Sequence, residues 1–245
     1  MKNFIITGAA GSLGTQITKN FYKKFNLICI DKNRIALKDL KKKYRRINIY
    51  ECNLTSPIEV NNLIKKINKK YGNIDIILNN AGTISSIPIV SLSKEGRFKT
   101  HSYINWKKII NNNLNTTFLI SSKVIENLCN NRKEGLIINV SSISAEGNIG
   151  QSAYSVAKSS IEILTKIWAQ ELSKFNIRVA CISPGFFDID STHKSLSTPK
   201  IKHIKMNTPV GRLGKPTELV NAIKFIINNK FFNGKILKLD GGLEI

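Results

Sequence analysis

Long hydrophobic runs and paired cysteines are both missing from this sequence. None of its 245 residues belongs to an apolar run near the roughly 20 residues that a membrane-spanning helix needs. His193 and His203 have no carboxylate or cysteine cluster beside them, so we expect no metal site. The cysteines stand singly and without metal-ligand spacing, which predicts reduced, mostly buried thiols and a cytoplasmic protein. These cysteines are Cys29, Cys52, Cys129 and Cys181.

Acidic residues are scarce in the chain. It has 16 Asp and Glu against 38 Lys and Arg, which gives a formal net charge of +22. Such a charge attracts nucleic acid, a membrane surface or an anionic substrate. The cations are spread over every segment, however, and no aromatic residues interleave them as a surface that stacks on nucleic acid requires. We therefore expect neither a membrane nor a nucleic-acid partner, and favour a compositional bias over a functional electric field.

Linkers and internal repeats are also absent, and apolar strand-like runs alternate with amphipathic stretches along the chain. This alternation predicts parallel strand pairing with right-handed crossovers. We predict a single α/β Rossmann domain over residues 1–245, with a doubly wound parallel sheet of about seven strands and helices on both faces. Six of the strands are expected at Phe4–Ile6, Leu27–Ile30, Ile47–Cys52, Ile74–Leu78, Leu136–Val140 and Val179–Ile182.

A glycine-rich turn directly follows the first expected strand. The segment Thr7–Gly14 reads TGAAGSLG, and a helical pattern of apolar residues begins within it. This order of strand, turn and helix is typical of dinucleotide-binding folds, because glycine lets the backbone approach a pyrophosphate and the helix N-terminus faces its charge. We expect the turn to bind a dinucleotide cofactor through Gly8, Gly11, Ser12, Leu13 and Gly14.

Asp31 follows the second expected strand. A carboxylate at this place accepts hydrogen bonds from the ribose hydroxyls of the adenosine and repels a 2′-phosphate. NAD is therefore favoured over NADP as the cofactor. Lys32 and Arg34 stand close enough to Asp31 to keep NADP as the alternative.

Tyr154 and Lys158 stand four residues apart at the start of a long expected helix. That spacing places both side chains on one helix face, about one turn apart. A free phenol has a pKa of about 10, and a neighbouring ammonium favours the phenolate, so we expect the pKa of Tyr154 to move towards neutrality. Ser142, shortly after the apolar run that ends at Val140, adds a hydroxyl for a substrate oxygen. These three groups suit proton exchange with an alcohol or a ketone.

Further segments follow one another in a recognisable order. They are NNAG at Asn79–Gly82, an asparagine at Asn113 in a helix expected from about Asn105 to Asn130, PG at Pro184–Gly185, and DGG at Asp240–Gly242. With the glycine turn and the catalytic set, they resemble the short-chain dehydrogenase/reductase family, classical type, nearly end to end and in the manner of 3-oxoacyl-carrier-protein reductases. The resemblance implies an NAD(P)-dependent oxidoreductase that acts on CH–OH groups and assembles as a homodimer or a homotetramer.

The resemblance also implies roles for single residues. Tyr154 transfers the proton, Ser142 bonds the substrate oxygen, and Lys158 lowers the tyrosine pKa and binds the nicotinamide ribose. Asn113 holds a water that links Lys158 to bulk solvent. Counting back from Tyr154 points nearer to Ser141, whereas the strand position favours Ser142, which we prefer. The residues implied at the cofactor beyond the glycine turn and Asp31 are Asn53, Leu54, Asn80, Ala81, Gly82, Tyr154, Lys158, Pro184 and Gly185.

The chain departs from the family pattern at three places. Asn53 stands where relatives usually carry Asp, although its carboxamide oxygen is still able to accept a bond from the adenine amino group. Ile189 stands where many relatives have Thr for the nicotinamide carboxamide, so a backbone group or Thr192 takes that role, or the cofactor is held more loosely. Extra residues lie in segment 84–103. We expect loops 84–103 and 186–208 to border the substrate, with the surface excursion or the oligomer contact as alternatives for the first.

Two other functions stay open. The spacing Gly8-x-x-Gly11-x-x-Gly14 is that of the extended branch, with its sugar epimerases and dehydratases, but the chain ends soon after Asp240. A nicotinamide-sensing binding protein is the other, and the intact catalytic set argues against it. Fold does not decide the substrate. The positive charge and a polar loop favour a polar or anionic small molecule, such as a sugar derivative or an acyl thioester, over a steroid.

Overall fold

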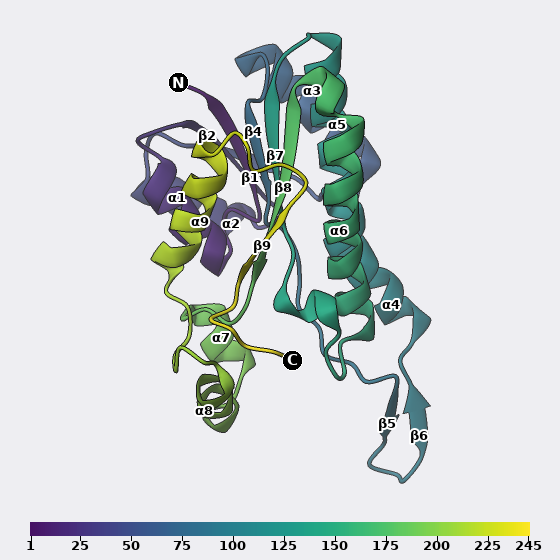
Figure 1. Cartoon of the computed structure of the whole chain (residues 1–245). Coiled ribbons are helices and arrows are strands. Elements are labelled where there is room, and N and C mark those ends of the chain that lie inside the picture. The colour runs from purple at the N-terminus through teal and green to yellow at the C-terminus, as the bar shows by residue number, and fades with distance from the viewer.

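Seven parallel strands form the central sheet of the computed structural model, which describes residues 1–245 (Figure 1). Their order is β3-β2-β1-β4-β7-β8-β9. The order reverses beside β1, as it does in doubly wound sheets, and the predicted fold class is confirmed. The strands are β1 Asn3–Thr7, β2 Asn26–Asp31, β3 Asn48–Glu51, β4 Ile76–Asn79, β7 Gly135–Val140, β8 Ile177–Pro184 and β9 Ile236–Leu239.

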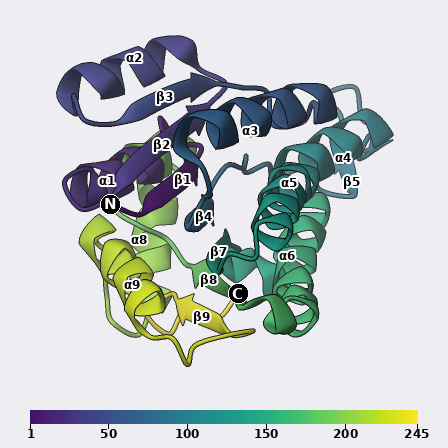
Figure 2. The ribbon, with the colours of Figure 1, turned by 90° about the horizontal axis from the view of Figure 1, so that it is seen from above.

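Helices cover both faces of the sheet, as Figure 2 shows from above. Side chains of α1, α2 and α9 pack on one face, and those of α3, α5 and α6 pack on the other. None of the helices combines the length and the apolar character that crossing a membrane takes. The helices are α1 Ser12–Phe21, α2 Arg34–Lys43, α3 Pro57–Tyr71, α4 Tyr103–Ile110, α5 Thr116–Asn130, α6 Ser152–Glu171, α7 Asp190–Ser195, α8 Thr198–Asn207 and α9 Pro216–Asn228.

Burial on both faces explains why the strands appear in the sequence as continuous apolar runs. In β1, Phe4 and Ile6 point into the cluster under α1 and α9, whereas Ile5 points into the cluster under α3, α5 and α6. All three side chains are fully buried. A parallel sheet covered on both sides needs apolar residues at every position, so the alternation seen in half-exposed strands is absent.

An asparagine ladder closes the amino end of the sheet. The first residues of β1, β2 and β3 are Asn3, Asn26 and Asn48. Asn48 Nδ2 donates to Asn26 Oδ1 at 2.8 Å, and Asn26 Nδ2 donates to Asn3 Oδ1 at 2.8 Å. Asn3 Nδ2 in turn donates to the carbonyls of Tyr71 and Asn73. These three asparagines therefore have a structural use.

Segment 84–103 contains a β-hairpin, which its lack of periodicity does not predict. The strands β5 Val90–Leu92 and β6 Phe98–Thr100 pair antiparallel and lie apart from the central sheet (Figure 1). Each strand has three residues and all of them are exposed. Strands this short leave too few positions for a period to be recognised.

Segment 186–208 also has more regular structure than a polar loop. It forms the helices α7 and α8, which lie on the opposite side of the sheet's carboxyl end from the hairpin (Figure 1). Pro199 stands in the first turn of α8, where its fixed φ suits a helix start.

Candidate active site

The carboxyl ends of five parallel strands meet at one edge of the sheet. The last residues of β1, β2, β4, β7 and β8 are Thr7, Asp31, Asn79, Val140 and Pro184. In open α/β sheets ligands bind at this edge, beside the strand where the order reverses. The glycine turn, Asp31, the Asn79–Gly82 segment, Ser142 and Pro184–Gly185 all lie at or directly after one of these strand ends.

The glycine turn lies in close contact with its neighbours. Gly8 has φ of +63°, and a Cβ atom added there would lie 2.9 Å from Ala81 Cα. A Cβ added at Gly14 would lie 2.2 Å from the Gly8 carbonyl oxygen. Only glycine fits either place, so the turn presents bare backbone to the edge of the sheet.

The N-terminus of α1 is open to an anion. Its cap is Gly11, which has no side chain to bond the first N–H groups, and no acidic residue stands in the first turn. The N–H groups of Ser12 and Leu13, together with the helix dipole, suit the pyrophosphate of a dinucleotide. The turn and the helix start therefore fit a dinucleotide cofactor.

Thr7 connects the glycine turn to the loop after β4, a role that sequence reasoning missed. Its Oγ1 accepts hydrogen bonds from the N–H groups of Asn80 and Ala81, both at 3.0 Å. The Asn80 side chain donates back to the carbonyls of Thr7 and Gly8 at 3.1 and 3.2 Å. Asn80 thus shapes the cofactor turn through its side chain. The sequence feature that could have predicted this role is the threonine directly before the first glycine of the turn.

Asp31 is fixed beside the glycine turn by two backbone donors. Ala10 N–H donates to one carboxylate oxygen at 3.1 Å, and Asn33 N–H donates to the other at 3.0 Å. Arg34, one of the two cations that keep NADP possible, pairs instead with Glu51 at 3.7 Å between Nε and Oε2. The two backbone donors therefore hold the Asp31 carboxylate in one orientation at this strand end.

Asn53 and Leu54 differ in their surroundings. Asn53 Oδ1, the oxygen expected at adenine, accepts from Thr55 N–H at 3.2 Å and from Thr55 Oγ1 at 2.8 Å. It closes a local turn, which asparagine commonly does after a strand. Leu54 is buried and packs in the cluster beneath α3.

Tyr154 and Lys158 lie together on the first turns of α6. Lys158 Nζ lies 5.7 Å from the centre of the Tyr154 ring and donates to the Val140 carbonyl at 2.8 Å. Both side chains are buried, with 6% of Tyr154 and 4% of Lys158 exposed. The four-residue spacing thus places an ammonium beside a phenol at the end of β7.

Burial has opposite effects on the pKa values of these two groups. It lowers the pKa of Lys158 to about 8, because the interior disfavours the ammonium. It raises the pKa of Tyr154 to about 12, and the Ser142 hydroxyl offsets part of this rise by hydrogen bonding. The expectation that the ammonium moves the tyrosine pKa towards neutrality thus differs from the structure, where loss of hydration has the larger effect.

The two adjacent serines have distinct partners. Ser141 is buried, and its Oγ donates to the Lys158 backbone carbonyl at 3.1 Å, which ties β7 to α6. Ser142 is half-buried, and its Oγ accepts a hydrogen bond from Ser144 N–H at 3.2 Å. Its hydroxyl also lowers the pKa of the Tyr154 phenol by hydrogen bonding. The geometry favours Ser142 as the serine that faces a substrate oxygen.

Asn113 is fully buried in a turn of π-helix, Asn111–Asn115, between α4 and α5. Its Nδ2 donates to the carbonyls of Ile109 and Thr83, and its Oδ1 accepts from Thr83 N–H at 3.2 Å. A Cβ added at Gly82 would lie 2.5 Å from Asn113 Oδ1 and 3.5 Å from Lys158 Nζ. Asn113, Gly82 and Lys158 therefore form one packed group. The expected single helix from about Asn105 to Asn130 is interrupted at this point.

The loop after β8 completes the edge. Gly185 N–H donates to the Leu239 carbonyl at 2.9 Å, and a Cβ at Gly185 would lie 2.8 Å from Asp240 Cα, so Pro184–Gly185 lies against the end of β9. Ile189 packs against the core cluster under α1 and α9. Thr192, its expected substitute, is buried on α7.

The structure was also searched for side chains that could bind a metal ion. No group of three or more His, Cys, Asp or Glu side chains is arranged so that it could hold a metal ion. The site instead offers a phenol, a hydroxyl and an ammonium beside a dinucleotide cradle, which suits proton transfer coupled to hydride transfer.

Comparison with known proteins identifies the class. A family model described as enoyl-(acyl carrier protein) reductase matches residues 8–244, and the chain belongs to this short-chain dehydrogenase/reductase family. It is 32% identical to the 3-oxoacyl-[acyl-carrier-protein] reductase FabG of Thermotoga maritima, over 98% of this chain and 97% of the relative. It is 31% identical to the FabG of Chlamydia muridarum, over 99% of this chain and 97% of that protein.

A solved structure shows the same fold. The 4-hydroxyisoleucine dehydrogenase complexed with NADH is 29% identical, with a TM-score of 0.87 over 99% of this chain and 98% of that chain. Together with the family match, this likeness makes the protein an NAD(P)-dependent oxidoreductase that acts on CH–OH groups.

Proposed function

We propose that Ser142, Tyr154, Lys158 and Asn113 are the catalytic residues of a reversible alcohol–ketone oxidoreduction at the carboxyl edge of the sheet. The bound nicotinamide supplies or accepts the hydride. Tyr154 gives its phenolic proton to the ketone oxygen in reduction and takes the alcohol proton in oxidation, and Ser142 bonds the same oxygen. The observation that supports this assignment most is the packed arrangement of Tyr154, Lys158 and Ser142 at the end of β7.

Lys158 has two tasks in this proposal. At neutral pH a lysine with a pKa of about 8 is still mainly protonated, so its charge favours the phenolate that forms during reduction. Its hold on the Val140 carbonyl leaves further N–H donors for the nicotinamide ribose. Asn113 fixes the Gly82–Thr83 backbone next to the ammonium and supports a proton path to solvent.

We propose NAD as the preferred cofactor. The Asp31 carboxylate is held in place beside the glycine turn, where it would bond ribose hydroxyls and repel a 2′-phosphate. The Arg34–Glu51 pair supports this preference, because Glu51, which lies opposite Asp31 in the β2–β3 register, neutralises part of the charge that would attract a 2′-phosphate.

For the substrate we propose a polar or anionic carbonyl compound or alcohol, such as an acyl thioester or a sugar derivative. Four lysines lie on the α7–α8 segment beside the carboxyl end of the sheet: Lys194, Lys200, Lys202 and Lys205. The segments 84–103 and 186–208 would form the substrate walls of a single domain that spans residues 1–245.

The experiment that tests the function is a turnover assay. Purified protein with NADH would be offered a 3-oxoacyl thioester, a keto sugar and a simple ketone, and loss of the reduced nicotinamide would be followed with product analysis. We expect reduction of at least one polar carbonyl compound. The function would be contradicted if the protein bound NADH but reduced no carbonyl compound of the panel and, with NAD, oxidised none of the corresponding alcohols.

We also propose that the chain is a cytoplasmic homodimer or homotetramer. On α6, Val156, Ile163 and Ile167 are 46%, 53% and 43% exposed and recur at helical spacing, and Phe118 on α5 is 49% exposed. Such an apolar helix face supports packing against a second helix face. Sedimentation velocity would give the oligomeric state.

The four cysteines, none of which forms a disulfide, support a reducing compartment such as the cytoplasm.

A further inference from the structure

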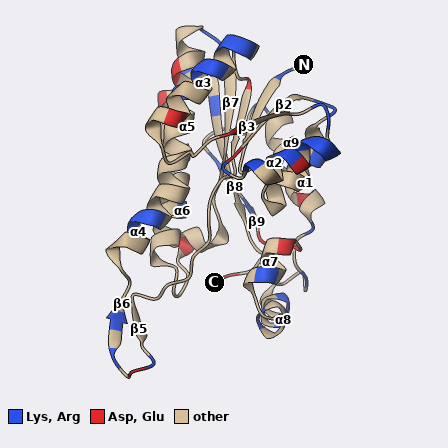
Figure 3. Ribbon diagram, turned by 180° about the vertical axis from the view of Figure 1, so that it is seen from behind, with Lys and Arg blue, Asp and Glu red and all other residues tan.

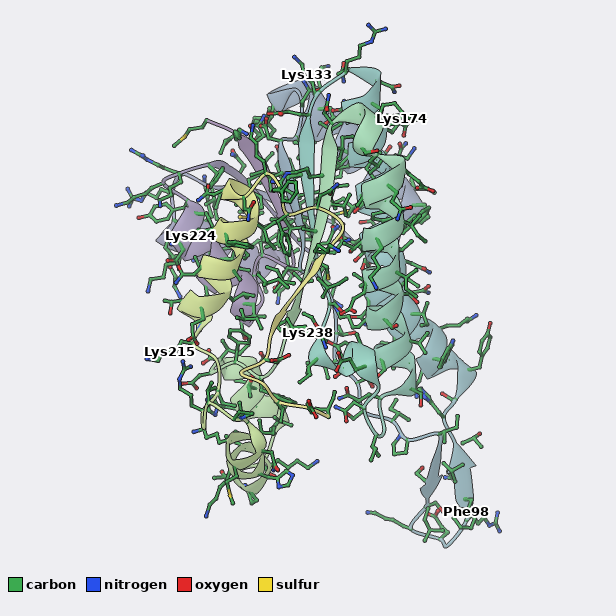
Figure 4. All side chains as sticks on the ribbon, in the orientation of Figure 1. Phe98, Lys133, Lys174, Lys215, Lys224 and Lys238 are labelled. Atoms are coloured by element: carbon green, nitrogen blue, oxygen red, sulfur yellow. The ribbon has the colours of Figure 1, made fainter.

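The base of segment 84–103 forms a wall beside Tyr154. Ile87 and Trp106, which stand on either side of the hairpin, pack against the small buried cluster that contains Tyr154. The tip of the hairpin takes no part in this wall, since Figure 4 places Phe98 at its far end, well removed from the sheet. The side chains at the base of the segment therefore border the candidate active site.

Gln151 belongs to the same wall and stands directly before α6. Its carbonyl accepts the Ser155 N–H at 2.7 Å, so helical spacing already holds at this residue, and residues three apart such as Gln151 and Tyr154 share a face. Its Nε2 donates to Ser86 Oγ at 3.0 Å. Its Oε1 is buried and has no hydrogen-bond partner. The side chain thus keeps one acceptor oxygen free in the wall beside the tyrosine.

His101 adds two more unpartnered atoms to this wall. Its backbone N–H donates to the Ile89 carbonyl at 2.9 Å, and its ring lies edge-on to Trp106 with the ring centres 6.3 Å apart. Both ring nitrogens are buried without a hydrogen-bond partner. Six buried side-chain atoms in the whole chain lack a partner, and His101 and Gln151 account for three of them. The unmet hydrogen bonds are therefore concentrated beside the candidate site.

Such atoms indicate where a ligand is to be bound. A buried polar group without a hydrogen bond costs about 1–3 kcal/mol, so folded chains rarely retain one without a use. The cover over this part of the wall is thin, because Ser86 and Pro88 are exposed. The Gln151–Ser86 bond is the only hydrogen bond between segment 84–103 and residues 141–171. A ligand that displaces this segment slightly gains access to the free atoms.

The two side chains define the chemistry of that ligand. A carboxamide oxygen needs a donor, and a neutral imidazole offers one donor and one acceptor. A hydroxyl group serves both side chains. No charged residue occurs in 84–89 or 147–155, so this part of the wall has nothing to neutralise a carboxylate or a phosphate. A plain methylene chain would leave all three atoms unpaired.

We propose that Gln151 and His101 form a hydroxyl-binding subsite, and that the substrate carries hydroxyl groups on the carbons next to its reacting carbonyl. The two residues determine specificity and do not take part in the proton transfer. The inference rests on the proposed function. It narrows the substrate to a polyhydroxy ketone or the corresponding polyol, such as a keto sugar, ahead of an unsubstituted acyl chain.

The test compares two ketones that have the same carbon chain. Erythrulose, offered as both enantiomers, has a hydroxyl group on every carbon except the carbonyl carbon, and 2-butanone has none. A 3-oxobutanoyl thioester is the acyl-chain probe. With NADH, we expect the unchanged protein to prefer erythrulose by at least about 100-fold in kcat/KM, because the other two probes leave the buried atoms unpaired.

Variants separate this binding from the intrinsic reactivity of the ketones. Gln151→Met keeps the length of the side chain without an acceptor, and should lower kcat/KM at least about tenfold for erythrulose while changing it less than about twofold for 2-butanone. His101→Phe keeps the edge-on ring and should act in the same direction. Ser86→Ala removes the bond to Gln151 but not the free oxygen, and should keep most of the preference. Gln170→Met, at the exposed far end of α6, is the matched control and should behave as the unchanged protein does.

Three results would overturn the inference while leaving the proposed function in place. The first is a preference of the unchanged protein for 2-butanone or the thioester. The second is an equal loss with both ketones in Gln151→Met, which a purely structural role would give. The third is an unaltered preference for erythrulose in that variant. Failure to reduce any carbonyl compound would instead remove the proposed function, and this inference with it.

Discussion

Tyr154 and Lys158 show how burial sets the chemistry of single residues in this protein. The lysine has its pKa lowered to about 8 and the tyrosine has its pKa raised to about 12, although the two groups are neighbours. A pattern of residue types reveals the pairing but not the hydration that each group loses on folding. For this reason the sequence predicts the positions of the pair and misses the direction of the tyrosine shift.

The lowered pKa of Lys158 has a consequence for stability. The unfolded chain, with a lysine pKa of 10.5, binds more protons than the folded chain between about pH 8 and 10.5, so the free energy of unfolding should rise with pH across this window. Lys158→Met should remove up to about 3 kcal/mol of this rise. Urea unfolding of both proteins at the two ends of the window measures it. Parallel pH dependences in the two proteins would contradict the burial of a charged lysine.

Gly82 and Asn113 offer a second test at this scale. Gly82→Ala places a Cβ 2.5 Å from Asn113 Oδ1, so we expect turnover to fall about 10–100-fold through displacement of the group beside Lys158. The double variant with Asn113→Ala removes the collision. It should be no slower than Asn113→Ala alone in steady-state kinetics. Additive losses would show that the two residues act separately.

Asp31 decides the cofactor in this account. Asp31→Ser should weaken NADH binding and strengthen NADPH binding, each by about tenfold, because the repulsion of a 2′-phosphate is removed. Fluorescence titration with both nucleotides measures the change. Lys32→Ser, at the exposed neighbour, is the control and should leave NADH affinity unchanged. An unaltered preference in the Asp31 variant would shift the assignment to other residues.

At the scale of elements, the asparagine ladder joins three strand ends that are far apart in the sequence. Asn26→Ala removes one donated and one accepted hydrogen bond, and should lower the free energy of unfolding by about 1–2 kcal/mol. Asn130→Ala, at the exposed end of α5, is the control and should have little effect. Urea unfolding of both variants checks this. Equal losses would mean that the ladder adds nothing.

The elements also show where sequence reasoning works and where it does not. Strands such as β1 and the turn Thr7–Gly14 have strong local signals, because burial on both faces and close backbone approach each restrict the residue types allowed. The hairpin has three-residue strands with an uncovered face, and the π-helical turn at Asn113 depends on contacts with Thr83. The periodicity of the local sequence predicts neither the hairpin nor the π-helical turn.

The sequence predicted only part of the candidate site, because some of its features depend on contacts between residues that are far apart in the chain. Asp31, Tyr154 and Lys158 could be placed at the carboxyl edge from their spacing and strand position. The bonds of Thr7 to the Asn80–Ala81 backbone and the local turn at Asn53 depend on hydrogen bonds that only the folded chain displays.

For the whole molecule, the net charge of +22 is spread rather than concentrated. Figure 3 shows Lys and Arg on helices and strands in all parts of the ribbon, with fewer Asp and Glu among them. Self-repulsion of such a charge disfavours the compact state and is screened by salt. We therefore expect the melting temperature to rise from low-salt buffer to physiological ionic strength. A melting temperature that falls with added salt would point to stabilising surface ion pairs instead.

The central claim is that Tyr154 exchanges the proton that accompanies hydride transfer. The most direct measurement is turnover and NADH affinity of Tyr154→Phe, with Tyr103→Phe on the exposed start of α4 as the matched control. We predict a loss of turnover of at least about 100-fold in Tyr154→Phe, with NADH affinity retained and the control fully active. Near-normal turnover in Tyr154→Phe would contradict the account.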